Sequence, residues 1–388
     1  MVVSALAIVP CSIAATVASR GGYSVTYLGE LAEAGATLVH GMNQFGRVVG
    51  ESGGIDGDGV SAFDRKRSGS IEPLEGLPGG DFSQAFGVNN HGLIVGSSNT
   101  STTLRAVLWT LDGKTQEIGT LPGDNSSQAL AINGQDEMVG FSSGPQGTRA
   151  FLWTKQRGMR DIGGLPGSDY TEATAINDLG QVAGMSGTAG ATHAFLWTAG
   201  RGMLDLGTLP GDRSSKAAAI NNLGQVAGTS HGPHGTHGFF WTKNEGMRDV
   251  GILGGENYSE ALGINDAGQV VGLAGDRGFL WTRVRGLQDL NHLLPSDSDV
   301  HIAGAFAINA RGQIAAYGGP DHLHQHHFNA PRAYLLTPSA TVKRRAFFCG
   351  PTLPAGDARG DLARPADASA DQASQAGSGN SESKNSVQ

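Results

Sequence analysis

The chain has 388 residues and a formal net charge of −8, with 61 glycines and only 16% charged residues. Glycine ordinarily makes up roughly 7% of a protein and charged residues roughly 25%, so this composition predicts many tight turns and few solvated helix faces. Nucleic-acid binding depends on basic side chains that attract the phosphate backbone, and this chain has a net negative charge. Nucleic acid is therefore excluded as an expected partner.

Residues 2–18 form an apolar stretch that ends in small residues, with Thr16 and Ala18 placed as at a signal-peptide cleavage site. This pattern predicts a signal peptide over residues 1–19 and export to the periplasm or the cell exterior. The stretch is shorter than the roughly twenty residues that cross a bilayer, so no membrane span is expected after cleavage. Cys11 and Cys349 lie outside the repeats described next, so the body needs neither a disulfide nor a Cys-ligated zinc site.

One asparagine recurs along the chain, first after 46 residues and then every 44. Three residues after each copy stands a glycine, except after Asn133, where Asp136 takes its place. Asn-x-x-Gly between apolar runs predicts a tight hairpin whose last residue is left-handed, a conformation that Asp also tolerates. The repeated asparagines are Asn43, Asn89, Asn133, Asn177, Asn221, Asn265 and Asn309.

Each repeat contains four short apolar segments, which we name strands a to d. Typical copies are residues 129–132 for strand a, 181–184 for strand b, 150–154 for strand c and 158–163 for strand d. Four strands of about five residues within about forty-four match one blade of a β-propeller. The small residues of strand a suit the crowded axis, and the continuous apolar run of strand c suits a sheet covered on both faces.

The two ends of the array complete each other. Residues 23–28 have the pattern of a strand d without a strand c, and residues 333–337 that of a final strand c without a strand d. Pairing them removes two exposed sheet edges. The sequence therefore predicts an all-β fold, a seven-bladed β-propeller over residues 22–338 that is closed by the N-terminal strand d pairing with the last blade. Residues 339–388 are rich in Ala, Asp, Gly and Ser and predict a disordered, low-complexity tail.

The strand c motif is most complete at residues 193–197, His-Ala-Phe-Leu-Trp, and it accompanies Ala-Ile-Asn-x-x-Gly-Gln-Val-Ala-Gly around the turn. In these motifs the chain resembles the HAF-repeat family of bacterial extracellular repeat proteins over residues 23–337. The resemblance implies export and repeat architecture. It implies no reaction, and no catalytic residue can be transferred from it.

The repeated aromatic and charged residues have two possible readings each. The strand c tryptophans could stack on sugars, but identical copies in successive repeats favour a core role. An acid in the d–a loop and a base just before strand c could form a charged ring at the channel mouth, or structural pairs in each blade. The tryptophans are Trp109, Trp153, Trp197, Trp241 and Trp281; the acids are Asp81, Asp124, Asp169, Asp212 and Glu256; the bases are Arg105, Arg149, His193, His237, Arg277 and Arg332.

Blade seven departs from the sevenfold repeat. A catalytic site should depart from it in this way, because a reaction needs one set of catalytic residues and not seven equal copies. The loop entering it and its b–c loop are both longer than in other copies and hold clustered His and Asp residues. Imidazole nitrogens and carboxylates could bind a divalent transition metal there, whereas a solvated His-rich loop is the plainer reading. The proposed metal ligands are His301, His322, His324, His326, His327, Asp297 and Asp299.

The sequence contains no nucleophile elbow, phosphate-binding glycine loop or His-Glu-x-x-His pair. The main functional hypothesis is accordingly a secreted, monomeric, non-enzymatic propeller that binds a protein or glycan on the face formed by the d–a and b–c loops. The alternative is a metal-dependent hydrolase or lyase that acts on an extracellular polymer, with its site at blade seven.

Overall fold

The computed structural model describes residues 22–31, 35–53, 59–66, 69–188, 190–320 and 330–339. The chain divides into two compact units, residues 1–341 and 342–388, and the second unit lies wholly outside the described residues. The predictions of a signal peptide over 1–19 and of a low-complexity tail also fall outside them, apart from Ser339.

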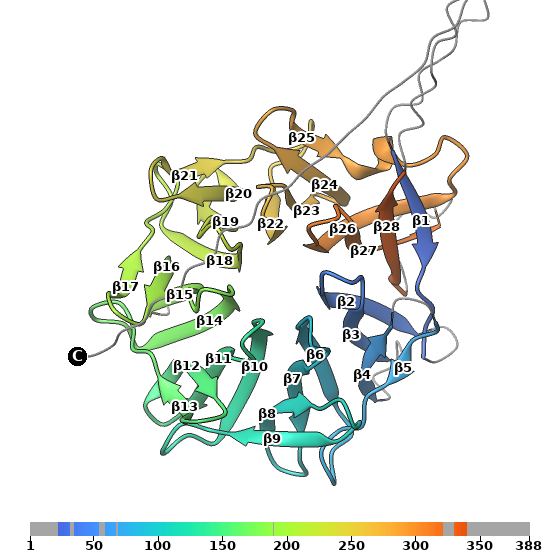
Figure 1. The fold of residues 1–388 in the computed structure, drawn as a ribbon. Coiled ribbons are helices and arrows are strands. Elements are labelled where there is room, and N and C mark those ends of the chain that lie inside the picture. The colour runs from blue at the N-terminus through green and yellow to red at the C-terminus, as the bar shows by residue number, and fades with distance from the viewer. Residues whose placement is uncertain are drawn as a thin grey trace, which may run out of the picture. The chain divides into compact units, whose positions relative to one another are not determined.

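Strands dominate the fold, and each repeat forms an antiparallel meander in the predicted order a, b, c, d (Figure 1). The first three repeats contain β2 (Ala36–Met42), β3 (Val48–Gly53), β4 (Val60–Arg65) and β5 (Glu72–Pro73); β6 (Ser83–Val88), β7 (Ile94–Asn99), β8 (Leu104–Trp109) and β9 (Thr115–Gly119); and β10 (Ser126–Ile132), β11 (Met138–Gly144), β12 (Gly147–Thr154) and β13 (Gly158–Asp161).

The next three repeats contain β14 (Tyr170–Ile176), β15 (Val182–Thr188), β16 (Ala191–Thr198) and β17 (Gly202–Asp205); β18 (Ser214–Ile220), β19 (Val226–Gly232), β20 (Gly235–Thr242) and β21 (Gly246–Asp249); and β22 (Ser259–Ile264), β23 (Val270–Ala274), β24 (Arg277–Thr282) and β25 (Gly286–Asp289). The last repeat follows a short 3-10 helix, η1 (Leu290–Leu293), and contains β26 (Val300–Ile308), β27 (Ile314–Pro320), β28 (Arg332–Pro338) and β1 (Tyr23–Tyr27).

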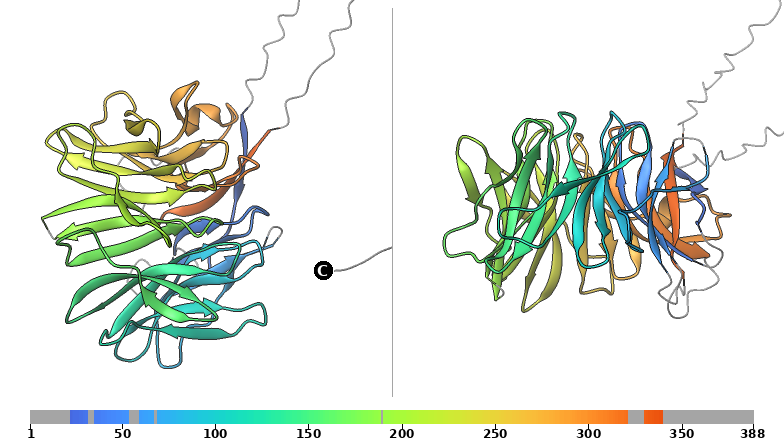
Figure 2. Two further views of the ribbon diagram at one scale, coloured as in Figure 1. Left: turned by 60° about the vertical axis from the view of Figure 1, so that its left-hand side comes forward. Right: turned by 90° about the horizontal axis from the view of Figure 1, so that it is seen from below.

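The strands are grouped into five four-stranded sheets and one eight-stranded sheet. The all-β propeller arrangement is confirmed, but the expectation of separate four-stranded blades does not hold for β10 to β17. One parallel pair, Thr148 with Tyr170, joins β12 to β14 and merges two meanders into one sheet. The corresponding pair one repeat further on, Thr236 with Tyr258, remains an isolated bridge. Figure 2 shows the sheets from two further sides, standing face to face around the ring.

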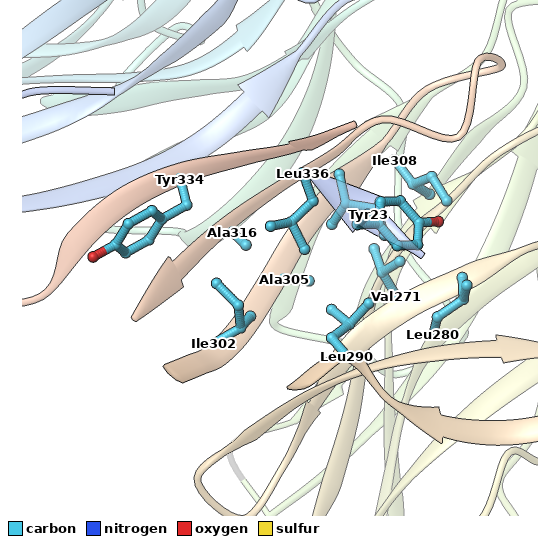
Figure 3. Packing of buried hydrophobic residues seen from close by; sticks show 11 residues of the cluster. Tyr23, Val271, Leu280, Leu290, Ile302, Ala305, Ile308, Ala316, Tyr334 and Leu336 are labelled. Atoms are coloured by element: carbon cyan, nitrogen blue, oxygen red, sulfur yellow. The ribbon is translucent and has the colours of Figure 1, made fainter. Parts of the chain in front are cut away.

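The N-terminal strand pairs with the last repeat as predicted. β1 runs antiparallel to β28, with Tyr23 opposite Pro338 and Tyr27 opposite Tyr334. Tyr23 is buried in an apolar cluster that draws side chains from β26, β27, β28, η1 and the neighbouring sheet (Figure 3). Leu28, just beyond β1, is buried in the adjoining cluster and donates its N–H to the Ala333 carbonyl at 3.0 Å. The first strand thus belongs to the core of the last sheet.

The repeated asparagines form a closed circle of hydrogen bonds. Each buried side chain donates from Nδ2 to the backbone carbonyl of the asparagine in the next repeat, and Asn309 returns to the carbonyl of Asn43 at 3.4 Å. The six other bonds measure 2.9–3.1 Å and run from Asn43 to Asn89, Asn133, Asn177, Asn221, Asn265 and Asn309 in turn. The seven repeats are therefore linked head to tail without a free end.

The turns have the predicted conformation. Gly180 has a φ of +69° and donates its N–H to the Asn177 carbonyl at 3.0 Å. Asp136, at the equivalent position, is the one non-glycine residue with a positive φ among those described, at 61°. The tryptophan prediction also holds: four of the five are buried, and Trp153 is half-buried against the same kind of core cluster.

Replacing Gly180 by valine should lower the free energy of unfolding by about 1–3 kcal/mol, because a β-branched side chain would be forced into the left-handed region. Chemical denaturation measures the loss. Gly200→Val is the matched control, since Gly200 lies in a turn with open space around it and no positive φ. Equal losses in the two variants would contradict the backbone explanation.

Candidate functional site

A cavity of about 580 Å³ lies on the axis of the ring, at the end where the a–b turns meet. Its central position follows from its lining, since residues from all seven repeats contribute to it. It opens on the face opposite to the d–a and b–c loops, because successive antiparallel turns alternate between the two ends of a sheet. This axial cavity is thus on the other face from the one that the sequence pattern favoured.

The residue after each repeated asparagine forms the mouth of this cavity. Its backbone N–H donates to the side chain of the equivalent residue in the next repeat, as from Gln44 to Asn90 Oδ1 at 3.0 Å and from Asp178 to Asn222 Oδ1 at 2.9 Å. The same bond starts from Gly134, Asn222 and Ala310 and ends on Asp178, Asp266 and Gln44. The circle is interrupted after Asn90 and Asp266, because Gly134 and Ala310 offer no side-chain acceptor.

Five of the residues that stand three positions before the repeated asparagines line the cavity. These are His40, Thr174, Ala218, Leu262 and Phe306. The rings of Phe86 and Phe306 flank His40, with centroid distances of 5.3 and 5.9 Å. Small side chains, Thr174 and Ala218, line the cavity from other repeats. The cavity therefore has an aromatic side and a more open side.

His40 is paired with a carboxylate. Its Nε2 lies 3.7 Å from Glu51 Oε1, and both side chains are largely buried, at 19% and 15% exposed. Glu51 also accepts a hydrogen bond from Gln84 of the next repeat. Burial acts to raise the pKa of Glu51, but the nearby imidazole of His40 and the hydrogen bond from Gln84 outweigh it and hold that pKa below its usual value. The carboxylate is therefore the stable form beside His40.

In the fourth and sixth repeats, tyrosines at or directly before the start of strand a are paired with glutamates of the same strand. Tyr170 donates from its hydroxyl to Glu172. Burial, with Glu172 next, raises the pKa of Tyr170, and burial and Glu260 do the same for Tyr258. Lys216 stands at the equivalent position of the repeat between them. Both phenols are therefore neutral donors at ordinary pH.

The predicted metal ligands of blade seven are only partly described. His301 is buried in β26, with Nε2 2.8 Å from the Asp276 carbonyl, to which it must donate. Asp297 and Asp299 are exposed in the loop before that strand. His322, His324, His326 and His327 lie outside the described residues. Within the ranges that the structure describes, no group of three or more His, Cys, Asp or Glu side chains could hold a metal ion, and the blade-seven site stays a prediction.

The repeated bases do not form a ring at the channel mouth. Five of the six pair with an acid twelve residues later, on strand d of the same sheet and away from the axis, which favours the structural reading. The sixth, Arg332, lies over the ring of Tyr27 at 5.7 Å. Two bases also reach the d–a loop acid: Arg149 lies 2.9 Å from Asp124, and Arg277 lies 3.7 Å from Glu256. The strand d pairs are Arg105 with Glu117, Arg149 with Asp161, His193 with Asp205, His237 with Asp249 and Arg277 with Asp289, at 2.8–3.6 Å.

The sequence interpretation missed His40, Glu51 and the axial cavity. A signal was present, because the position three before the asparagine varies among His, Phe, Leu, Thr and Ala, while its two neighbours are always Ala or Gly apart from Val39.

Fold and site together define a β-propeller with a ligand-sized cavity on its axis. Neither a family model nor a curated protein matches the sequence. The structure is similar to a virginiamycin B lyase from Staphylococcus aureus (TM-score 0.54, 10% identity, 81% of this chain and 99% of that chain). It is also similar to an oligogalacturonate lyase from Vibrio parahaemolyticus (TM-score 0.51, 11% identity, 82% and 98%). At such identities these likenesses show the fold alone. Among the described residues, no helix has the length and apolar character to cross a membrane.

Proposed function

We propose that this chain is an exported, seven-bladed binding propeller that holds a hydroxyl-rich ligand, part of a glycan, in its axial cavity. In this reading the eight-stranded sheet counts as two blades, which the seven-membered asparagine circle supports. The proposal gives the propeller a binding role and, by itself, no chemistry.

The axial cavity is the observation that carries the proposal. Its volume of about 580 Å³ falls within the roughly 300–1,000 Å³ of small-molecule sites. The mouth presents amide and carboxylate groups, which can donate to and accept from hydroxyls. The aromatic side supplies an apolar face against which a sugar ring can pack. A flat protein partner would use neither feature.

Filling the cavity should abolish ligand binding. Ala218→Phe places a ring in the open side of the wall and is expected to weaken affinity at least about 100-fold, because overlap with the ligand leaves no room for both. Isothermal titration with neutral, amino and acidic oligosaccharides measures the effect. Ala199→Phe, at an exposed turn away from the cavity, should bind as the wild type does. Absence of binding across the whole panel would refute the glycan proposal.

A further inference from the structure

The pair of His40 and Glu51 breaks the sevenfold pattern on two adjacent strands of one repeat. At the position of His40 the other repeats carry Phe, Leu, Thr or Ala, and at the position of Glu51 they carry Ser, Phe, Met, Thr, Leu or Tyr. The fold therefore needs no ion pair at this point. A largely buried charged pair is costly to desolvate and is often replaceable by apolar residues without loss of stability. Only one repeat carries such a pair, and it lies beside the axial cavity. We therefore expect the pair to have a role other than packing.

The geometry of the pair is that of an oriented base. His40 Nε2 is buried and makes no hydrogen bond to the residues that the structure describes, and the nearest carboxylate oxygen is Glu51 Oε1 at 3.7 Å. This leaves Nδ1 as the ring nitrogen available to the cavity that His40 lines. A carboxylate on one nitrogen favours the proton there and keeps the other nitrogen as an acceptor. Gln84 holds the carboxylate from the neighbouring repeat, and the rings of Phe86 and Phe306 restrict the imidazole. Glu51 is the titratable group that contacts His40 in the described part of the chain.

We infer that the axial cavity hydrolyses an ester carried by its hydroxyl-rich ligand, such as an acetyl ester of a glycan, with His40 as the catalytic base. This inference rests on the proposed function, because the ester must first bind in the cavity. Nδ1 takes a proton from water while the water oxygen bonds to the ester carbonyl carbon. The tetrahedral intermediate then loses the alkoxide as the acyl C–O bond breaks, and the imidazolium returns the proton to that alkoxide. Ester and water give acid and alcohol, and nothing is oxidised or reduced.

Ester hydrolysis fits this wall better than cleavage of a glycosidic bond does. Glycosidases generally need two carboxyl groups on either side of the bond, whereas the carboxylate next to His40 is turned toward the imidazole and Gln84. The carboxylates at the mouth, Asp178 and Asp266, are occupied as acceptors of backbone N–H groups. One imidazole suffices for an ester, because the same group serves first as base and then as acid. Glu51 is a positioning residue, since it acts through His40 and stabilises the imidazolium that forms.

The experiment measures acetate released from acetylated xylan, mannan and pectin, together with hydrolysis of 4-nitrophenyl acetate, by the full chain. We expect His40→Gln to lower kcat by roughly 100-fold or more, the usual scale for a lost general base, with an unchanged melting temperature. Glu51→Gln should lower kcat with little change in KM, because the imidazolium that forms during the reaction loses a stabilising negative charge. A merely structural Glu51 would not produce this split between kcat and KM. His231→Gln, at an exposed histidine on β19, is the matched control and should act as wild type.

Two outcomes would overturn the inference: no hydrolysis of any probe above the buffer rate, or full activity in His40→Gln. Should that variant fail to fold, carbethoxylation of the wild type serves instead, and activity that survives modification mapped to His40 would refute the role. Titration separates the two proposals. Glycan binding without hydrolysis overturns the esterase alone, whereas absence of binding overturns the proposed function.

Discussion

Deletion of residues 22–30 is expected to destabilise the entire ring by roughly 5 kcal/mol, a large part of the 5–15 kcal/mol that holds a typical domain. The deletion removes β1, which pairs with β28 over five residues. It also removes Tyr23 and Leu28, which are 7% and 2% exposed, and burial of each large side chain contributes about 1.5–3 kcal/mol. The freed edge of β28 would add a tendency to aggregate.

The matched control removes residues 346–388, which lie outside the described residues, and should leave the melting temperature unchanged. Differential scanning calorimetry compares the two truncated proteins with the full chain. Equal melting temperatures for the two truncations would contradict closure of the ring by the first strand.

Replacing Asn177 by alanine should lower the free energy of unfolding by about 3 kcal/mol. Its Oδ1 accepts from the N–H groups of Leu179 and Gln181, and its Nδ2 donates to the Asn221 carbonyl. Alanine leaves these buried groups without their partner, at about 1–3 kcal/mol for each that water cannot reach. Urea denaturation measures the change, and Asn257→Ala, at an exposed loop residue, provides the control.

Asn177→Asp separates the two halves of this interaction. The carboxylate can still accept from both backbone N–H groups, but it cannot donate to Asn221 and it faces the Gln181 side-chain oxygen, 2.7 Å from Nδ2 in the native protein. The variant should be less stable than the wild type at neutral pH and should recover as the pH falls, because protonation restores a donor. A deficit that does not depend on pH would show that the donated bond is unimportant.

Periodicity made the fold accessible from the sequence. The fold could be predicted from local patterns. These are the repeated asparagine, the left-handed residue three positions later, and the incomplete blades at 23–28 and 333–337. Repetition of the first two along the chain made them a much stronger signal than a single copy would be. The merging of β12 and β14 was not predictable, because it depends on a single bridge between Thr148 and Tyr170 that no composition signals.

The site was less accessible for a physical reason. Which side chains of strand a face the axis depends on the register shift within that strand, as between Val39 and Gly41 beside His40. A bulge changes side-chain direction without changing the spacing of the motif. The pairing of bases with strand d acids was missed for a related reason, since the partners are neighbours only once strands c and d are aligned.

The head-to-tail circle of asparagines also bears on how the protein comes apart. Open repeat arrays behave as nearly one-dimensional chains, in which terminal units can fray while the centre persists. A circle has no terminal unit, and the bond from Asn309 to Asn43 makes every repeat an interior one. Loss of any repeat therefore breaks contacts on two sides at once, so unfolding should proceed as a single concerted transition in place of stepwise erosion from an end.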